Sequence, residues 1–325
     1  MTKYKVVTMG GGTGTFAVIA ALKKLPTDIS SIVAVSDSGG STGRIRDEFG
    51  FQPVGDLRQS LAALADPKGQ EWIRKILLYR FNKGSGLKGH NLGNLILTAL
   101  QDMSGSTTQS LEIASNVFQL VGRVMPITEE NVELVIYYDN GLFTVGEHIL
   151  DEIIAPPEKI DRVELKPPCT ISATAREAIL SADYIFIGPG DLYASLMAVL
   201  VVGGVKEALQ ESKAKVVFLA NLMTRKTQTH GMTAQDHLSV VEAAMGKKAD
   251  FVILNNEPIP TQILAAYSAA TELPVEDDLD KSSRVIRAPL ISSTRVKKDQ
   301  ADTAYRSLLR HDTGKLAEVF AAILE

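Results

Sequence analysis

Cysteine is almost absent from the 325-residue sequence: Cys169 stands alone, so no internal disulfide and no cysteine-rich metal motif can form. The five histidines make no HExxH pattern, which argues against a zinc site. An excess of positive charge is also missing, because 34 Lys and Arg residues face 38 Asp and Glu residues. The resulting net charge of −4 argues against a nucleic-acid partner, which requires a basic face.

Long uncharged apolar runs are missing as well. The longest lies between Asp191 and Lys206 and contains Gly203-Gly204, so it is shorter than the roughly 20 residues that a membrane-spanning helix needs. No signal-peptide pattern precedes the first predicted strand. We therefore expect a cytoplasmic protein without a membrane span, and the lone cysteine fits a reducing compartment.

Short apolar runs alternate with stretches of helical periodicity. The predicted strands are 6–9, 32–35, 184–187, 216–219 and 251–254. The predicted helices are 16–25, 172–181, one that opens after the loop 188–190, 233–245 and a last one from about 315. Residues 57–121 look mainly helical, and 272–283 reads as an exposed acidic loop. Strands that are apolar throughout fit burial on both faces. The pattern predicts a Rossmann-like three-layer α/β/α sandwich with a mostly parallel sheet, as a single domain over residues 1–325.

The alternation of apolar strands and helices is interrupted in the segment from about 124 to 165. Two runs of alternating residues flank Asp139-Asn140-Gly141, a sequence that is typical of a tight β-hairpin. We interpret this segment as an antiparallel insertion in the main domain.

Glycine-rich segments follow the first two predicted strands. Glycines let the backbone approach a ligand closely, and the amides at the start of the next helix point at an anion. The first segment predicts a phosphate site, although a tight strand-to-helix turn would use the same residues. Its candidate binding residues are Gly10, Gly11, Gly12, Thr13 and Gly14.

The second glycine-rich segment leaves several ligands open. Asp37 lies about where a dinucleotide-binding fold places its ribose-binding acid, so an NAD site must be considered. The Ser, Gly and Arg residues that follow suit a phosphate-rich or sugar-bearing ligand, or a carboxylate with bound Mg²⁺. A flexible polar loop is the structural alternative. The candidate residues here are Asp37, Ser38, Gly39, Gly40, Ser41 and Arg44.

Two later segments place polar groups at predicted helix starts. Asp56 with Gln59 reads as an N-cap pair. The positive charge of Arg58 opposes the dipole of the same helix, and a nearby anion would stabilise it. His90 and Asn94 would share one helix face, with Asn91 beside them. These three side chains suggest hydrogen bonds to a base or sugar, and local capping contacts are the alternative.

Further polar residues follow later strands, at the sheet edge where ligands bind in open α/β folds. Asp191 could cap a helix, accept from ribose or bind a metal, and Asp312 or Thr313 is a natural N-cap for the last helix. If the protein is an enzyme, Asp37 and Asp191 are the candidates for catalysis and for holding Mg²⁺. The other candidates at this edge are Gly188, Gly190, Asn221, Thr224 and the phosphate-binding candidate Arg310.

Seven motifs in order resemble the YvcK family of gluconeogenesis factors, which is related to 2-phospho-L-lactate transferase (CofD). They are GGGTG at 10–14, SDSGGSTGRIR at 36–46, GDLR at 55–58, GHNLGNL at 89–95, GPGDLY at 188–193, NLMT at 221–224 and RHDT at 310–313. The sequence departs from the family pattern at one position and in one three-residue segment. The family has Ser where Asp191 stands and Gly-Glu-Thr where this chain has 227–229, which puts in doubt any role carried over to the loop 224–231.

The resemblance implies a UDP-sugar ligand such as UDP-N-acetylglucosamine and a regulatory role in gluconeogenic growth, cell shape and wall-precursor metabolism. It further implies that Arg310 touches the nucleotide sugar and that Thr313 is a candidate phosphorylation site for a Ser/Thr kinase. A Mg²⁺-dependent transferase of a phosphate-bearing group is the enzymatic alternative, and an NAD-dependent oxidoreductase is a third reading, disfavoured because the second loop would fill the adenosine space. The sequence leaves a homodimer open.

Overall fold

The computed structural model describes residues 3–66, 69–152, 159–293 and 307–325. Its main sheet has seven strands in the order β10-β9-β8-β7-β1-β2-β3, and each neighbouring pair is parallel. Because β1 lies between β2 and β7, the strand order reverses at this point. The strands are β1 (Tyr4–Gly10), β2 (Thr27–Val33), β3 (Arg123–Pro126), β7 (Tyr184–Ile187), β8 (Lys215–Leu219), β9 (Phe251–Asn255) and β10 (Val285–Ala288).

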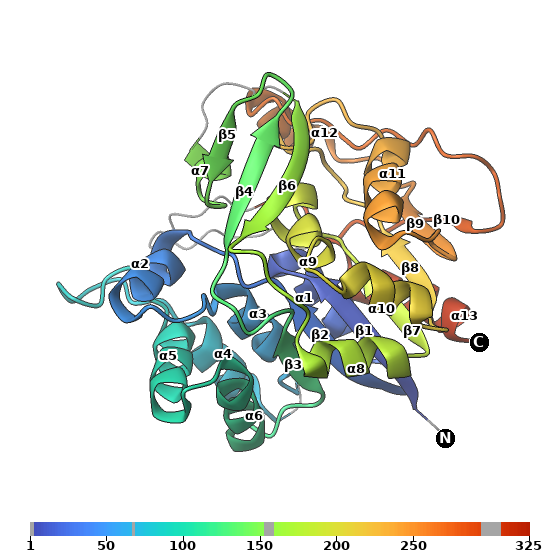
Figure 1. Ribbon diagram of the computed structural model, residues 1–325. Coiled ribbons are helices and arrows are strands. Elements are labelled where there is room, and N and C mark those ends of the chain that lie inside the picture. The colour runs from blue at the N-terminus through green and yellow to red at the C-terminus, as the bar shows by residue number, and fades with distance from the viewer. Residues whose placement is uncertain (1–2, 67–68, 153–158, 294–306) are drawn as a thin grey trace.

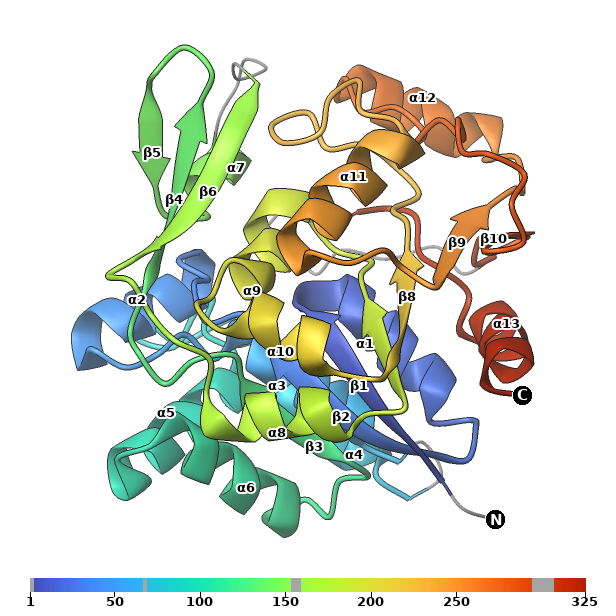
Figure 2. The same cartoon turned by 45° about the vertical axis from the view of Figure 1, so that its right-hand side comes forward.

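Helices cover both faces of the main sheet (Figures 1 and 2). On one face α1 packs against α3 and α13, and on the other α10 packs against α8 and α11. The predicted three-layer α/β/α architecture is therefore confirmed. The bounds of these helices are α1 (Gly12–Leu22), α3 (Gly55–Leu64), α8 (Ala173–Ser181), α10 (Val205–Glu211), α11 (Ala234–Met245) and α13 (Thr313–Leu324).

The central strands hold the layers together because they present apolar side chains on both faces. All four residues of β7 are buried, as are the last five of β1. Phe186 of β7 meets Phe320 of α13 with ring centroids 4.8 Å apart. Burial of apolar surface contributes roughly 25 cal/mol per Å² to folding. This two-sided burial is what the continuous apolar runs of the sequence indicated.

A helical extension lies beside β3. The helices α4, α5 and α6 follow α3 and pack against one another in sequence, and α6 returns to β3. The mainly helical character expected for 57–121 is confirmed. The second glycine-rich segment differs from the loop that its composition suggested, because a helix, α2, already begins at Gly40. The bounds are α2 (Gly40–Phe49), α4 (Glu71–Leu78), α5 (Leu92–Ser104) and α6 (Thr107–Val117).

A separate three-stranded antiparallel sheet, in the order β5-β4-β6, projects at the end of the molecule away from the N-terminus (Figure 1). The predicted hairpin is confirmed: Gly141 has a φ of 83°, and its amide donates to the carbonyl of Tyr138 at 3.0 Å. The predicted start of the insertion at 124 is wrong, because 123–126 form β3 of the main sheet. The elements of this part are β4 (Glu133–Tyr138), β5 (Phe143–Val145), β6 (Ile160–Lys166) and the short α7 (Ile149–Glu152).

Several other boundaries differ from the sequence prediction. The first helix starts earlier than residue 16 and ends at Leu22, and the second strand covers 27–33 rather than 32–35. No helix within the described ranges has both the length and the apolar character needed to cross a bilayer. The helix predicted after the loop 188–190 forms as the π-helix η1 (Leu192–Met197), which α9 (Ala198–Leu200) continues. The sequence pattern did not reveal α12 (Thr261–Ala269) or β10.

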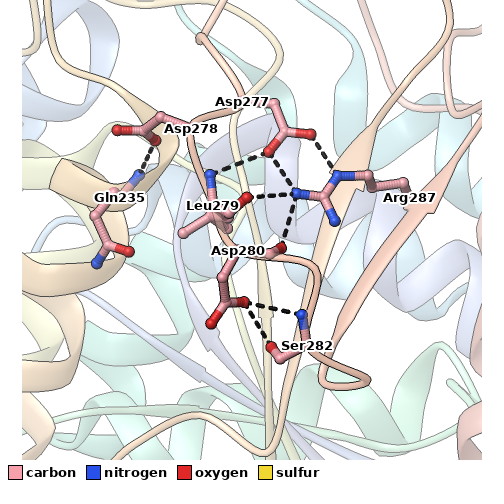
Figure 3. A network of polar contacts seen from close by, with 7 residues as sticks. All are labelled: Gln235, Asp277, Asp278, Leu279, Asp280, Ser282 and Arg287. Atoms are coloured by element: carbon pink, nitrogen blue, oxygen red, sulfur yellow. Dashed lines mark hydrogen bonds and ion pairs between the residues drawn. The ribbon is translucent and has the colours of Figure 1, made fainter.

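The acidic loop after α12 is pinned by one arginine (Figure 3). Arg287 of β10 contacts both carboxylate oxygens of Asp277, at 2.5 and 2.9 Å. The same guanidinium donates to the carbonyls of Leu279 and Asp280 at 2.9 and 3.1 Å. The Arg287 side chain also holds the pKa of Asp277 below its usual value. The loop is thereby fixed against the main domain, and its first residue, Glu272, is buried.

Candidate functional site

A cleft of about 260 Å³ opens at the carboxyl ends of β1 and β7, where the strand order reverses. Ligands of open α/β sheets bind in this crevice. The loops after β1, β2, β7 and β8 line it, together with the first turn of α3 and residues from the last third of the chain. Sixteen of the predicted binding residues line the cleft: Gly11, Gly12, Thr13, Gly14, Asp37, Gly39, Gly40, Ser41, Asp56, Arg58, Asn94, Gly190, Asp191, Asn221, Thr224 and Arg310.

Both backbone conformation and close packing require glycine in the first loop. Gly10 and Gly12 have φ values of 148° and 64°, which favour glycine. A Cβ on Gly14 would lie 2.0 Å from the carbonyl oxygen of Pro189. The loops after β1 and β7 therefore touch, and the first turn of α1 reaches the lining of the cleft.

Three helices begin at the cleft without a capping side chain. The N-cap residues of α1, α2 and α3 are Gly11, Gly39 and Val54, and none of them makes a side-chain capping bond. Away from the lining, side chains cap α6, α8, α11 and α13, whereas α4, α10 and α12 have no such bond. Because helix N-termini attract negative groups, this edge is suited to an anion.

Carboxylates already face some of these helix ends. A Cβ on Gly11 would lie 2.1 Å from Oδ2 of Asp56, so this carboxylate lies against the start of α1. Asp37 Oδ1 accepts from the Gly39 amide at 2.9 Å, and its Oδ2 would lie 2.5 Å from a Cβ on Gly55. An entering phosphate must share these positions with two acids. The predicted N-cap role of Asp56 is wrong, because α3 begins one residue earlier and the acid lies within its first turn.

Arg58 joins α3 to α5 in the wall of the cleft. Its side chain is buried, Nε donates to Asn94 Oδ1 at 2.7 Å, and Nη1 donates to the Leu77 carbonyl at 3.1 Å. Asn94 Nδ2 in turn lies 3.5 Å from the hydroxyl of Ser41 and 3.4 Å from that of Thr42, both in the first turn of α2. The guanidinium of Arg58, which the sequence places unfavourably at a helix N-terminus, is therefore held by a buried hydrogen-bond network that connects α2, α3 and α5.

The neighbouring motif is arranged differently from the prediction. Asn91 is the N-cap of α5 and accepts from the Asn94 amide at 3.2 Å, so His90 precedes the helix and the predicted face shared by His90 and Asn94 is wrong. His90 Nδ1 lies 3.3 Å from Ser41 Oγ. Burial lowers the pKa of His90, and the Arg44 guanidinium lowers it further. Arg44 itself is exposed. The predicted residues that lie outside the lining are Gly10, Ser38, Arg44, His90, Asn91 and Gly188.

The loops after β7 and β8 are bonded to each other. Asn221 accepts from the Gly190 amide at 3.1 Å and donates to its carbonyl at 2.8 Å. Gln228 Oε1 accepts from the amides of Tyr193 and Ala194, at 3.3 and 3.2 Å. Gln228 rather than Asp191 therefore satisfies the first amides of η1, which gives the segment 227–229 a structural role and leaves Asp191 as a lining carboxylate.

The far end of the cleft is partly apolar. Met223, Tyr267, Ile291 and Leu309 form a small cluster of their own. The Tyr267 hydroxyl lies 2.6 Å from Ser307 Oγ and accepts from the Leu309 amide at 3.0 Å, which fixes the chain just before the predicted ligand residue Arg310. The cleft thus joins a glycine-rich polar end to an end that Met223, Tyr267 and Leu309 line with less polar side chains.

Known proteins share both the sequence and this architecture. Residues 6–293 match the family described as 2-phospho-L-lactate transferase CofD. The chain belongs to the CofD family. It is 34% identical to the gluconeogenesis factor of Bacillus subtilis over 331 residues, covering 99% of both chains, and 36% identical to that of Halalkalibacterium halodurans over 327 residues, covering 100% and 97%. A crystal structure of a UPF0052-family protein from Bacillus halodurans superposes with a TM-score of 0.88 at 33% identity over the full length of both chains.

Half of the lining of this CofD-family cleft was not foreseen. Some of these residues are close in sequence to predicted ones, and extending each candidate list along its motif by a few residues would have included them. They are Thr42, Gly55, Gln59 and Ser195. Others come from distant segments and gave no local signal. These are Arg80 before α5, Glu147 from the antiparallel insertion, and Tyr267, Glu272, Ser307 and Leu309 from the last third of the chain. His311 also lines the cleft and lies within the RHDT motif, next to the predicted Arg310.

Charges of both signs line the CofD-family cleft, which leads to a prediction about Asp56. Because its carboxylate faces the start of α1, we expect Asp56→Asn to tighten binding of a diphosphate ligand about tenfold, or ~1.4 kcal/mol, in metal-free buffer. Titration calorimetry with pyrophosphate, comparing wild type and variant, measures this. The charged lining residues are Asp37, Asp56, Glu147, Asp191 and Glu272, against Arg58, Arg80, Arg225 and Arg310.

The matched control is Asp47→Asn, since that acid is exposed and lies outside the lining. It should leave the affinity unchanged. Weaker binding by Asp56→Asn would contradict the prediction, because it would mean that the carboxylate itself holds the ligand. Added Mg²⁺ should reduce the gain, since a cation between the phosphates and Asp56 removes the repulsion.

Proposed function

We propose that the cleft binds a nucleotide sugar of the UDP-N-acetylglucosamine type, and that the protein is a ligand-sensing regulator linked to gluconeogenic growth, cell shape and wall-precursor metabolism. The observation that carries this proposal is the convergence of the N-termini of α1, α2 and α3 on a glycine-lined cleft at the strand-order reversal. The names of the bacterial relatives supply the link to gluconeogenesis.

Each part of such a ligand has a matching region in the cleft. The diphosphate would lie over the starts of α1, α2 and α3, with Arg58 in the wall behind it. Carboxylates accept hydrogen bonds, so Asp191 and Asp37 suit the hydroxyl groups of ribose or sugar. The apolar far end suits the base. A bare inorganic phosphate would leave that end unused, which favours a larger nucleotide ligand.

Calorimetric titration with UDP-N-acetylglucosamine tests the proposal. We expect saturable binding in the wild type and a loss of at least about tenfold, ~1.4 kcal/mol, in Arg310→Met, because this guanidinium lies at the cleft and suits a phosphate or a planar base. Arg44→Met is the matched control: Arg44 is exposed, and its loss should not change the affinity. If millimolar UDP-N-acetylglucosamine produces no heat of binding, the proposal is refuted.

Regulation by a Ser/Thr kinase acting at Thr313 is part of the same proposal. Thr313 is the first residue of α13, and its hydroxyl accepts from Lys24 Nζ at 3.1 Å. A phosphate on this hydroxyl would gain from the helix N-terminus and from Lys24, but it would lie beside the capping carboxylate of Asp312. Because Arg310 is three residues away, phosphorylation is expected to alter the cleft at its far end.

A second candidate function is Mg²⁺-dependent transfer of a phosphate-bearing group, which the name of the family and the carboxylates at the glycine loops favour. Across the described ranges, no three His, Cys, Asp or Glu side chains gather closely enough to hold a metal ion. Asp37 or Asp191 would therefore share the cation with phosphate oxygens and water, which is how Mg²⁺ is commonly bound. Turnover of a nucleotide-linked phosphate ester that is lost with EDTA and in Asp37→Ala would support this function, and inactivity across a substrate panel would oppose it.

A further inference from the structure

The helix α5 is amphipathic in the reverse of the usual sense. A surface helix normally turns its apolar stripe to the core and its polar side to water. The buried residues of α5 are instead mostly polar or small: Gly93, Asn94, Leu97, Thr98 and Gln101. The opposite side carries apolar residues at spacings of three and four, which place them in one stripe along the helix. This outer stripe consists of Leu92, Leu95, Ile96, Ala99 and Met103.

Hydrogen bonds explain why the inner side of α5 is polar. Asn94 Oδ1 accepts from Arg58 in the cleft wall at 2.7 Å, and Thr98 Oγ1 donates to the Asn94 carbonyl at 2.9 Å. Further along the helix, Gln101 Nε2 donates to Thr107 Oγ1 at 2.9 Å. These buried polar contacts fix the rotation of α5 about its axis, and the apolar stripe is therefore left facing outward.

The outer stripe does not pack against the core. Leu92, Leu95 and Ile96 are half-buried, Ala99 is exposed, and Met103 is 81% exposed. In the described part of the chain, none of the five belongs to the core cluster or packs against it. The helix lies at the outer edge of the molecule (Figures 1 and 2). Contiguous apolar surface that remains exposed in this way marks an interaction site.

The charges at the two ends of α5 are opposite in sign. No charged residue occurs from Leu92 to Gln101, and the exposed Asp102 follows at the C-terminal end. The exposed Lys83 and Lys88 lie in the loop that precedes the N-terminal end. A second copy of α5 running in the opposite direction would bring each positive end to a negative end, with the uncharged stripes facing each other. A parallel copy would place like charges together.

We propose that the outer stripe of α5 is the interface of a homodimer, in which two copies of α5 pack antiparallel across a twofold axis. Such an interface uses the same patch on both subunits and must be self-complementary, which the opposite charges provide. The stripe of one helix buries less than the ~800 Å² per partner of a standard interface, so we expect a dimer that dissociates in the micromolar range. The inference does not depend on which ligand the cleft binds.

Sedimentation velocity of the full-length protein tests this interface. We expect twice the mass of the chain at about 100 µM and dissociation on dilution to about 1 µM. Ala99→Glu should be monomeric throughout, because each copy would bury a charge without a partner. Leu142→Glu is the matched control: it also places a charge on an exposed apolar position, in the hairpin of the antiparallel insertion, and should dimerise like the wild type. A wild type that stays monomeric, or a folded Ala99→Glu that dimerises equally well, would overturn the inference.

Cysteine cross-linking tests the antiparallel arrangement without introducing a charge. With the axis at the middle of α5, two copies of residue 99 would be offset by about 3 Å along the helices, and two copies of residue 103 by about 15 Å. A short bismaleimide should therefore link Ala99→Cys into dimers much more efficiently than Met103→Cys. The wild type is the control, because its only cysteine, Cys169, is buried. Equal cross-linking of the two variants, or none in Ala99→Cys, would overturn the inference.

Discussion

Gly14→Ala is expected to destabilise the protein by about 2–3 kcal/mol and to abolish nucleotide-sugar binding. The new Cβ would lie 2.0 Å from the Pro189 carbonyl oxygen, and this contact is with backbone, so no rotamer change relieves it. Since Gly14 lies inside α1, alanine's higher helix propensity would by itself add up to about 1 kcal/mol of stability. The two effects have opposite signs, and the steric one should prevail.

Thermal or urea unfolding together with calorimetric titration measures both consequences. Gly86→Ala is the matched control, because a Cβ at that position would have no other atom within 4 Å and the φ of Gly86 is not positive. That control should stay within about 0.5 kcal/mol of the wild type. Unchanged or increased stability of Gly14→Ala would show that the loops after β1 and β7 do not meet as described.

Arg58→Met is expected to lower the free energy of unfolding by about 3 kcal/mol. Methionine fills much of the same volume but cannot donate, so Asn94 Oδ1 and the Leu77 carbonyl would each lose the hydrogen bond that Arg58 makes in this buried wall. Ligand binding should also weaken, because the guanidinium supplies positive charge behind the starts of α2 and α3. Urea denaturation measures the change in stability.

Arg44→Met again serves as the control, since the same substitution at an exposed position should cost less than about 0.5 kcal/mol. A double variant, Arg58→Met with Asn94→Leu, should cost less than the sum of its single changes, because both members of the pair are removed. Strict additivity would contradict a direct interaction between these two side chains.

The parallel sheet was predictable because strands buried on both faces leave continuous apolar runs, as in 184–187. The start of α2 was not predictable, since Gly40, Ser41, Thr42 and Gly43 have poor helix propensity and resemble a loop. Tertiary contacts override that propensity: Ser41 and Thr42 meet Asn94, and Gly43 packs against the Ser38 carbonyl. The edge strand β10 was missed because all four of its residues are only half-buried and give no strong apolar signal.

The same contrast holds for the cleft. Residues directly after strands could be assigned by position, because parallel strands bring their carboxyl ends to one edge. His311 and Tyr267 could not, since their place depends on how the last third of the chain folds back over β8 and β9. The RHDT motif drew attention to Arg310 for its charge, whereas the burial of His311 in the cleft lining is a tertiary property that a sequence does not display.

A crystal structure with UDP-N-acetylglucosamine would show directly whether the helix starts hold the diphosphate. We expect the diphosphate over the starts of α1, α2 and α3, with the Asp56 carboxylate moved away from Gly11 or bridged to the phosphates by a cation. A nucleotide bound outside the cleft would contradict this assignment. So would a cleft without ligand at saturating concentration, with Asp56 still against Gly11.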